Sequence, residues 1–272
     1  MAQALNQTAR PGVGSGCNRG AVPVAMRNRR SVVLRAALLA AIAPFIFGDA
    51  ILAAEPYRVL SASGGTSSPA VLLVPGCSGF VASNGVNPYD ERAGALQAAG
   101  YVVVFVDYLG RRSLRNCAGG RDVSHAEVGK DILEAAAWIR DQPGIAAARI
   151  AVIVWSYGGG GVIAALAAMP PGPPLLAKAV MYYPDCRRAI PWSSTGVSVL
   201  LLMGAIDEVA LPALCDAVTK AAPANSLRAI LYSNARHAFD VRSLPERAEF
   251  GRLGYNAAAA QASWETVLEF LR

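Results

Sequence analysis

Short runs of consecutive hydrophobic residues alternate with longer helical patterns from about residue 55 to the end of the chain. A continuous run is typical of a strand buried on both faces of a sheet, because neither face of that strand meets water. The runs predict strands at residues 70–74, 101–106, 150–154, 178–183, 198–203 and 227–231. The stretches between them predict helices at residues 90–99, 124–141, 157–169, 212–221 and 256–271.

Strands that alternate with helices predict an α/β fold, with a central, mostly parallel sheet and helices on both faces. Gly100 is a typical residue for ending the first helix, and Ser124 and Glu127 form a capping-box pattern at the start of the second. No internal repeat interrupts the alternation, so residues 55–272 are predicted to form a single domain. In such a sheet, functional groups gather at the carboxyl ends of the strands.

The net charge of +6 belongs almost entirely to the first 54 residues of the 272-residue chain. This segment holds six arginines and one acid, Asp49, so it carries +5 and leaves +1 for the remainder. The remainder has no basic stripe with interleaved aromatic residues, which argues against nucleic-acid binding. Charged residues make up only 16% of the chain, a composition that disfavours a disordered protein.

Residues 26–54 have the organisation of an export signal. A basic segment follows Met26, an apolar run covers residues 36–47, and small residues come next, so cleavage is expected after Ala50 or near Ala53–Ala54. The apolar run is shorter than the ~20 residues that a membrane-spanning helix needs, although an uncleaved inner-membrane anchor stays the alternative. The sequence therefore predicts a periplasmic or secreted protein.

Two further features refine this interpretation of the N-terminus. The pair Arg29–Arg30 is similar to the start of a twin-arginine export signal. Residues 1–25 have no pattern and are interpreted as an upstream extension, with Met26 as the true start.

Cysteine usage agrees with export. Cys17 lies in the N-terminal extension, and four cysteines remain in the predicted domain: Cys77, Cys117, Cys186 and Cys215. An even number of cysteines in an exported chain allows two disulfides, and the count alone leaves three connectivities open.

A serine stands at the turn between a predicted strand and a predicted helix. The stretch "IAVIVWSYGGGGVIAAL", residues 150–166, places Ser156 at the tip of this turn. Free N–H groups at a helix start favour developing negative charge, which suits a nucleophile. Each glycine inside a helix costs ~1 kcal/mol relative to alanine, so residues 158–161 indicate close backbone approaches. A dinucleotide loop is disfavoured, because the G-x-G-x-x-G pattern and its acid are absent from the sequence.

A serine hydroxyl becomes a good nucleophile only when a base removes its proton. The chain contains two histidines. His125 stands at a predicted helix start, where a solvated side chain is expected. His237 follows the strand at residues 227–231, at the edge of the sheet where chemistry is expected, and is the predicted base.

An acid that orients this histidine is expected at another strand end. Asp207 comes just after the strand at residues 198–203 and would hold the His237 ring in the required tautomer, with Glu208 as the second candidate. The order Ser156, Asp207, His237 is the order used by α/β-hydrolases.

The oxyanion hole of such a site needs two backbone N–H groups. Tyr157, directly after the serine, is the first candidate donor, and Cys77 in the loop after the first strand is the second, with Ser78 as its alternative. Two separated histidines and no clustered thiolates predict that no metal is bound, and no cofactor is expected.

Several segments together resemble the dienelactone hydrolase family of α/β-hydrolases. They are "PAVLLVPGCSGF", "LQAAGYVVVFVDYLGRR", "VWSYGGG", "MYYPDC", "LLLMGAIDEVALPALC" and "RHAFD", and the resemblance covers about residue 57 to the C-terminus. It implies an α/β-hydrolase fold and hydrolysis of a small ester or lactone through an acyl-enzyme. It also implies Ser156, Asp207 and His237 as the triad by position.

The chain departs from the namesake enzyme of this family at several positions. Ser156 stands where that enzyme has a cysteine, and Gly76 stands where it has a glutamate. Asp240 follows "HAF", where that enzyme has a basic residue nearby. These differences favour an esterase-like member over a true dienelactone hydrolase. Arg111, with Arg112 beside it, and Trp155 are expected to approach the substrate.

The loop positions in this fold suggest the disulfides Cys77–Cys117 and Cys186–Cys215, because both members of each pair follow strand ends at one edge.

Val154 stands where the usual Gly-x-Ser-x-Gly turn has its first glycine. A β-branched side chain there is expected to open or shift the turn and to reduce activity without abolishing it. The departure also keeps a non-catalytic binding protein of this fold as an alternative, and acyl transfer to an alcohol by the same triad as another. Haloalkane chemistry is disfavoured, since it needs a carboxylate in place of Ser156.

Overall fold

The structure, a computed structural model, describes residues 56–62, 67–80, 87–117, 122–169, 172–187, 196–244 and 252–272. The predicted export signal within residues 1–54, the twin-arginine pair and Cys17 lie outside these residues. Among the described residues, no helix is both long and apolar enough to cross a membrane.

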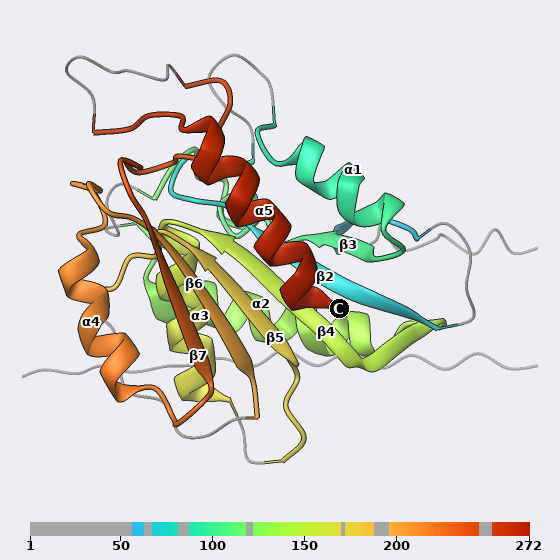
Figure 1. Cartoon of the computed structure of the whole chain (residues 1–272). Coiled ribbons are helices and arrows are strands. Elements are labelled where there is room, and N and C mark those ends of the chain that lie inside the picture. Colours follow the sequence, from blue (N-terminus) through green and yellow to red (C-terminus); the bar gives the residue numbers. More distant parts are fainter. Residues whose placement is uncertain are drawn as a thin grey trace, which may run out of the picture. The chain divides into compact units, whose positions relative to one another are not determined.

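Within this part of the chain, seven strands form one sheet in the order β1-β3-β2-β4-β5-β6-β7 (Figure 1). The strands are β1 (Arg58–Leu60), β2 (Ser68–Val74), β3 (Val102–Phe105), β4 (Ile145–Trp155), β5 (Lys178–Tyr182), β6 (Ser198–Gly204) and β7 (Leu227–Tyr232). Every neighbouring pair from β3 to β7 is parallel, and β1 is antiparallel to β3. The prediction of a mostly parallel α/β sheet is therefore confirmed.

Helices cover both faces of the sheet. They are α1 (Asp90–Ala98), α2 (His125–Arg140), α3 (Tyr157–Ala168), α4 (Pro212–Ala221) and α5 (Ala257–Leu271). Figure 1 shows α5 crossing the front face of the sheet, and α2 and α3 on the face behind the sheet. The Arg92 guanidinium of α1 lies 4.5 Å from the centre of the Trp264 ring of α5, which ties these two helices together.

The predicted start of α2 is confirmed by its hydrogen bonds. The Glu127 N–H donates to the Ser124 hydroxyl over 3.2 Å, and the Ser124 N–H donates to the Glu127 carboxylate over 2.8 Å. This capping box satisfies N–H groups that a helix start leaves without partners.

The structure differs from the prediction at two strands. β1 has only three residues and is partly exposed, so it gives no apolar run. β4 begins at Ile145, five residues before the predicted start. The prediction missed these residues because they are partly or fully exposed and include Arg149. Hydrophobic runs identify the buried part of a strand and miss its exposed part.

Candidate active site

Ser156 lies between β4 and α3, in a backbone conformation that is unusual for a residue with a side chain. Its φ is +50° and its ψ is −113°. The Ser156 N–H donates to the carbonyl of Tyr182 over 2.9 Å. The Ser156 carbonyl accepts from the N–H groups of Gly159 at 2.9 Å and Asp185 at 3.0 Å. These bonds hold the sharp turn that projects a nucleophile from a strand end.

The glycines after Ser156 are explained by what surrounds them. A Cβ atom added to Gly158 would lie 2.8 Å from the carbonyl oxygen of Pro75, and one added to Gly159 would lie 2.2 Å from Pro184 Cβ. A Cβ atom on Gly160 or Gly161 would similarly lie 2.4 Å from the His125 ring or from Val128 Cγ1. Close approach of α2 and of two strand-end loops therefore requires glycine at the start of α3.

Val154 does not displace the serine turn, contrary to expectation. It is fully buried inside β4, where it pairs with Val74 of β2 and Met181 of β5. The parallel ladder continues past it to the pair Trp155–Tyr182. The valine side chain is accommodated in the core because it belongs to the regular strand and not to the turn.

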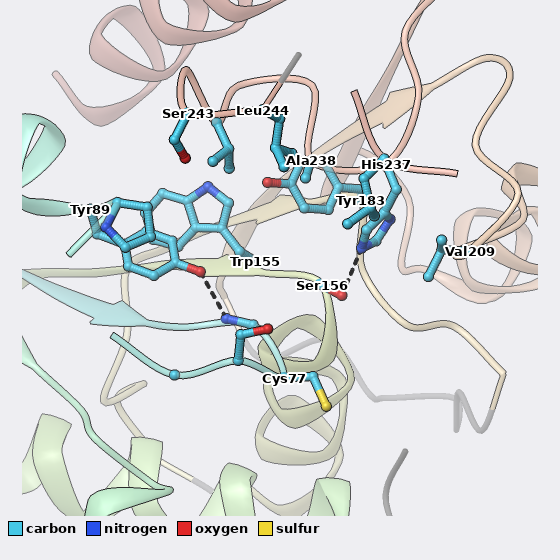
Figure 2. A pocket seen from close by; sticks show the side chains of 16 residues that line it. Cys77, Tyr89, Trp155, Ser156, Tyr183, Val209, His237, Ala238, Ser243 and Leu244 are labelled. Carbon is cyan, nitrogen blue, oxygen red and sulfur yellow. Dashed lines mark hydrogen bonds between the residues drawn. The ribbon is translucent and has the colours of Figure 1, made fainter. Parts of the chain in front are cut away.

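Three side chains from three loops form a continuous hydrogen-bonded series, of which Figure 2 shows the contact between Ser156 and His237. His237 Nε2 lies 2.9 Å from Ser156 Oγ, and His237 Nδ1 lies 2.7 Å from Asp207 Oδ2. His237 and Asp207 are 5% and 2% exposed, respectively. Such a series has the arrangement of a nucleophile, its base and an orienting acid.

Asp207 is held by its own loop. Its second carboxylate oxygen accepts from the N–H groups of Val209 and Ala210, both at 2.8 Å. Glu208, the alternative acid, is exposed, and its carboxylate lies 3.8 Å from the Arg236 guanidinium. The structure thus brings Asp207, and not Glu208, to the histidine.

The loop after β2 passes directly beside the serine. A Cβ atom on Gly76 would lie 3.4 Å from the Cβ of Ser156, and Cys77 and Ser78 line the same pocket. Cys77 forms a disulfide with Cys117. Tyr157 is the first residue of α3, and its hydroxyl donates to the carbonyl of Val123. Cys77 and Tyr157, the two candidate oxyanion donors, therefore both lie close to Ser156.

The pocket above Ser156 has a volume of about 350 Å³ and a largely apolar wall. The side chains of Tyr89, Trp155, Tyr183, Val209, Ala238 and Leu244 surround Ser156 and His237 in Figure 2. Among the described residues that line the pocket there is no lysine, arginine, aspartate or glutamate. The described part of the wall therefore offers a mainly apolar surface beside Ser156 and His237.

Of the two residues expected to approach the substrate, Trp155 lines the pocket and Arg111 does not. The Arg111 guanidinium lies 3.1 Å from Glu134 and 3.6 Å from Asp131, two carboxylates of α2. Arg112 is likewise bound to Asp131. The prediction for Arg111 was wrong because carboxylates on α2 bind this cation, which no local pattern near residue 111 indicates.

Asp240 lies behind the pocket wall and is also buried. It accepts hydrogen bonds from Trp155 Nε1 at 3.0 Å and from the Tyr183 hydroxyl. Burial, followed by the nearby Asp240 charge, raises the pKa of Tyr183 well above its usual value, so this hydroxyl stays protonated. Asp240 thereby orients two aromatic side chains of the pocket, a role that the sequence reading missed.

His125 is not a solvated histidine, contrary to expectation. Its side chain is 12% exposed, its ring centre lies 4.4 Å from that of Tyr157, and its Nε2 lies 3.5 Å from the Asp185 carboxylate. Burial alone would raise the pKa of Asp185, but the hydrogen bonds from Arg187 and the nearby His125 ring lower that pKa well below its usual value. The glycines of α3 admit the His125 ring, which explains its burial.

Both suggested disulfides are present. Cys77 is joined to Cys117, and Cys186 is joined to Cys215. The first joins the loops after β2 and β3, and the second joins the loop after β5 to α4. Among the described residues, no cluster of three or more histidine, cysteine or acidic residues has the arrangement of a metal site.

The parallel sheet, the serine turn and the order of the three polar residues are together those of the α/β-hydrolase fold. The sequence matches the dienelactone hydrolase family over residues 57–272, and the chain belongs to that family. Membership of this family supports a hydrolytic enzyme. No curated protein matches the chain.

Several solved structures share the fold. A protein from Klebsiella pneumoniae assigned as a dienelactone hydrolase is 19% identical with a TM-score of 0.60, covering 77% of this chain and 88% of that one. A dienelactone hydrolase-like promiscuous phosphotriesterase from metagenomic libraries is 20% identical with a TM-score of 0.60, covering 76% and 87%. Esterase 2 of Thermogutta terrifontis is 19% identical with a TM-score of 0.54, covering 79% and 88%. At these identities the likeness concerns the fold.

Proposed function

We propose that the protein hydrolyses small, uncharged carboxylic esters or lactones through an acyl-enzyme on Ser156. The observation that carries this proposal is the hydrogen-bonded series from Asp207 through His237 to Ser156, at 2.7 and 2.9 Å. This geometry gives the serine hydroxyl a base within proton-transfer distance and gives that base an orienting carboxylate.

Acylation begins when His237 Nε2 takes the proton of Ser156 Oγ as this oxygen attacks the carbonyl carbon of the ester. The carbonyl oxygen becomes negative and is stabilised by the N–H groups of Cys77 and Tyr157. His237 then gives its proton to the leaving alcohol, while Asp207 stabilises the charged imidazole ring. A water molecule, deprotonated by His237, then attacks the acyl carbon. The bond from this carbon to Ser156 Oγ breaks, His237 returns the proton to Oγ, and the acid is released.

The uncharged pocket wall supports the assignment of the substrate class. A carboxylate on the substrate would need a cation near the site, and Arg111 and Arg112 are instead paired with the carboxylates of α2. The substrate is therefore an ester whose acyl and alcohol groups carry no charge. Esters with an added carboxylate should be cleaved with a lower kcat/KM than their neutral analogues.

Labelling with a fluorophosphonate probe tests the nucleophile. Wild-type protein should be labelled, and Ser156→Ala should lose the label, since the probe bonds covalently to an activated serine. Ser243→Ala is the matched control, because Ser243 lines the same pocket and should leave labelling in place. Unlabelled wild-type protein, or label retained in Ser156→Ala, would favour a non-catalytic binding protein.

We also propose that the protein is exported. The two disulfides are consistent with an oxidising compartment, and the sequence of residues 26–54 has the pattern of an export signal. The N-terminal residue of the protein recovered from the periplasm or the medium tests this proposal.

A further inference from the structure

The Gly76–Cys77 peptide group and the peptide group before it are held from several sides by hydrogen bonds. The Gly76 carbonyl oxygen accepts from the Tyr108 hydroxyl at 2.9 Å and from the Gly79 N–H at 3.1 Å. The Gly76 N–H donates to the Tyr89 hydroxyl at 3.1 Å. A loop next to a nucleophile is thereby fixed by two buried tyrosines.

The orientation of this carbonyl fixes the direction of the Cys77 N–H. The carbonyl of residue 76 and the N–H of residue 77 belong to one peptide plane and point in opposite directions when the bond is trans. With the carbonyl bound to Tyr108, the N–H of Cys77 is aimed away from Tyr108. Rotation of this peptide group would break the hydrogen bond from Tyr108 and would change the direction of the Cys77 N–H.

The side chain and the carbonyl group of Cys77 are held by the loop after β3. Its side chain is bonded to Cys117, and its carbonyl accepts from the Cys117 N–H at 3.0 Å. Figure 2 shows the Cys77 sulfur pointing away from Ser156 and His237, so the disulfide anchors the loop without entering the pocket. Cys117 is fully buried, so the anchor lies in the packed core.

We propose that Tyr108 and the Cys77–Cys117 disulfide are positioning groups that hold the Cys77 N–H toward the oxyanion of the reacting ester. This proposal rests on the hydrolase function proposed above. Burial raises the pKa of Tyr108 far above its usual value, so its hydroxyl keeps the proton that it donates to Gly76. Preorganised donors of this kind stabilise the transition state more than the bound substrate, so their loss lowers kcat and leaves KM nearly unchanged.

Two variants test the two positioning groups. Tyr108→Phe removes the hydroxyl and keeps the ring, and the double variant Cys77→Ala, Cys117→Ala removes the disulfide and keeps the N–H of residue 77. We expect kcat for p-nitrophenyl butyrate to fall about 10-fold in Tyr108→Phe and about 10- to 100-fold in the disulfide variant, and KM to stay within about 2-fold of wild type. These losses are smaller than or equal to the loss of about 10²–10³ in kcat that full removal of one oxyanion donor causes. The affinity for a trifluoromethyl ketone, which forms a tetrahedral oxyanion on the serine, should fall in the same proportion.

The second disulfide supplies a matched control. The double variant Cys186→Ala, Cys215→Ala loses a disulfide of the same fold and should have a lower Tm, with kcat and ketone affinity within about 2-fold of wild type. Equal losses of kcat in both disulfide variants would overturn the positioning role of Cys77–Cys117. Tyr108→Phe removes a single oxygen atom and keeps the ring in the core, so this variant is expected to fold. Wild-type kcat and ketone affinity in it would overturn the role of Tyr108, even where a disulfide variant fails to fold. Wild-type protein that is not labelled by a fluorophosphonate would instead overturn the hydrolase function and, with it, this proposal.

Discussion

At the scale of single residues, the two glycine positions of the usual serine turn have different physical requirements. Val154 occupies the first and lies in a regular, fully buried part of β4. Gly158 occupies the second, and a Cβ atom there would lie 2.8 Å from a backbone oxygen. Only the second position excludes a side chain in this protein, so the departure at Val154 leaves the contact between Ser156 and His237 in place.

The substitution Val154→Gly should therefore cost stability without a gain in activity. It removes a buried side chain and adds backbone freedom, which together lower the free energy of unfolding by about 2–4 kcal/mol. We expect kcat/KM for a p-nitrophenyl ester to stay the same or to fall. Urea unfolding and steady-state kinetics measure the two quantities, with Val154→Ala as a control that removes most of the side chain and keeps a Cβ atom. A rise in kcat/KM would mean that the valine does crowd the turn.

The residues of the candidate site differ in how far the sequence could predict them. Ser156, Asp207 and His237 each follow a hydrophobic strand directly, so their position at one edge of the sheet follows from the order of the elements. The partners of Arg111 and His125 could not be predicted in this way. They lie on α2 and in the loop after β5, and they meet only when those elements pack together.

At the scale of elements, α3 is shaped by its neighbours more than by its own helix propensity. Four successive glycines start a helix that would otherwise favour alanine, since each glycine costs ~1 kcal/mol there. The loops after β2 and β5 and the first turn of α2 approach these glycines within the space that a Cβ atom would occupy. The sequence predicted such close approaches, but the elements that make them became identifiable only in the fold.

This explanation predicts opposite effects for the same substitution in two helices. Gly159→Ala should destabilise the protein by about 1–3 kcal/mol despite the better helix propensity of alanine, because its Cβ would lie 2.2 Å from Pro184 Cβ. Gly94→Ala in α1 is the matched control: a Cβ atom there meets nothing within 4 Å, so the variant should gain up to about 1 kcal/mol. Chemical denaturation of both variants measures the difference. A stabilised Gly159→Ala would contradict the close packing of α3.

At the scale of the whole molecule, both disulfides lie near the edge of the sheet that carries the candidate site. One anchors the loop that holds a candidate oxyanion donor, and the other joins the loop after β5 to α4, which follows the Asp207 loop. The sequence could supply the cysteines and their even number, whereas the pairing depended on which strand-end loops become neighbours. The Cys77–Cys117 disulfide makes the compartment in which the chain folds relevant to the geometry of the site.

Export and disulfide formation should therefore be observed together in the protein recovered from cells. We expect the full chain, expressed in a bacterium with a periplasm, to yield a mature form that begins between residues 51 and 55, because cleavage is predicted after Ala50 or near Ala53–Ala54. This form should show no thiol that reacts with a maleimide under denaturing conditions until a reductant is added, since its four cysteines are paired. Intact-mass measurement before and after reduction checks both expectations. The double variant Arg29→Lys, Arg30→Lys tests whether the twin-arginine pair directs export of the chain. Recovery of the uncleaved chain in the membrane fraction would favour the anchor instead, and reactive thiols in the exported form would contradict the disulfide pairing.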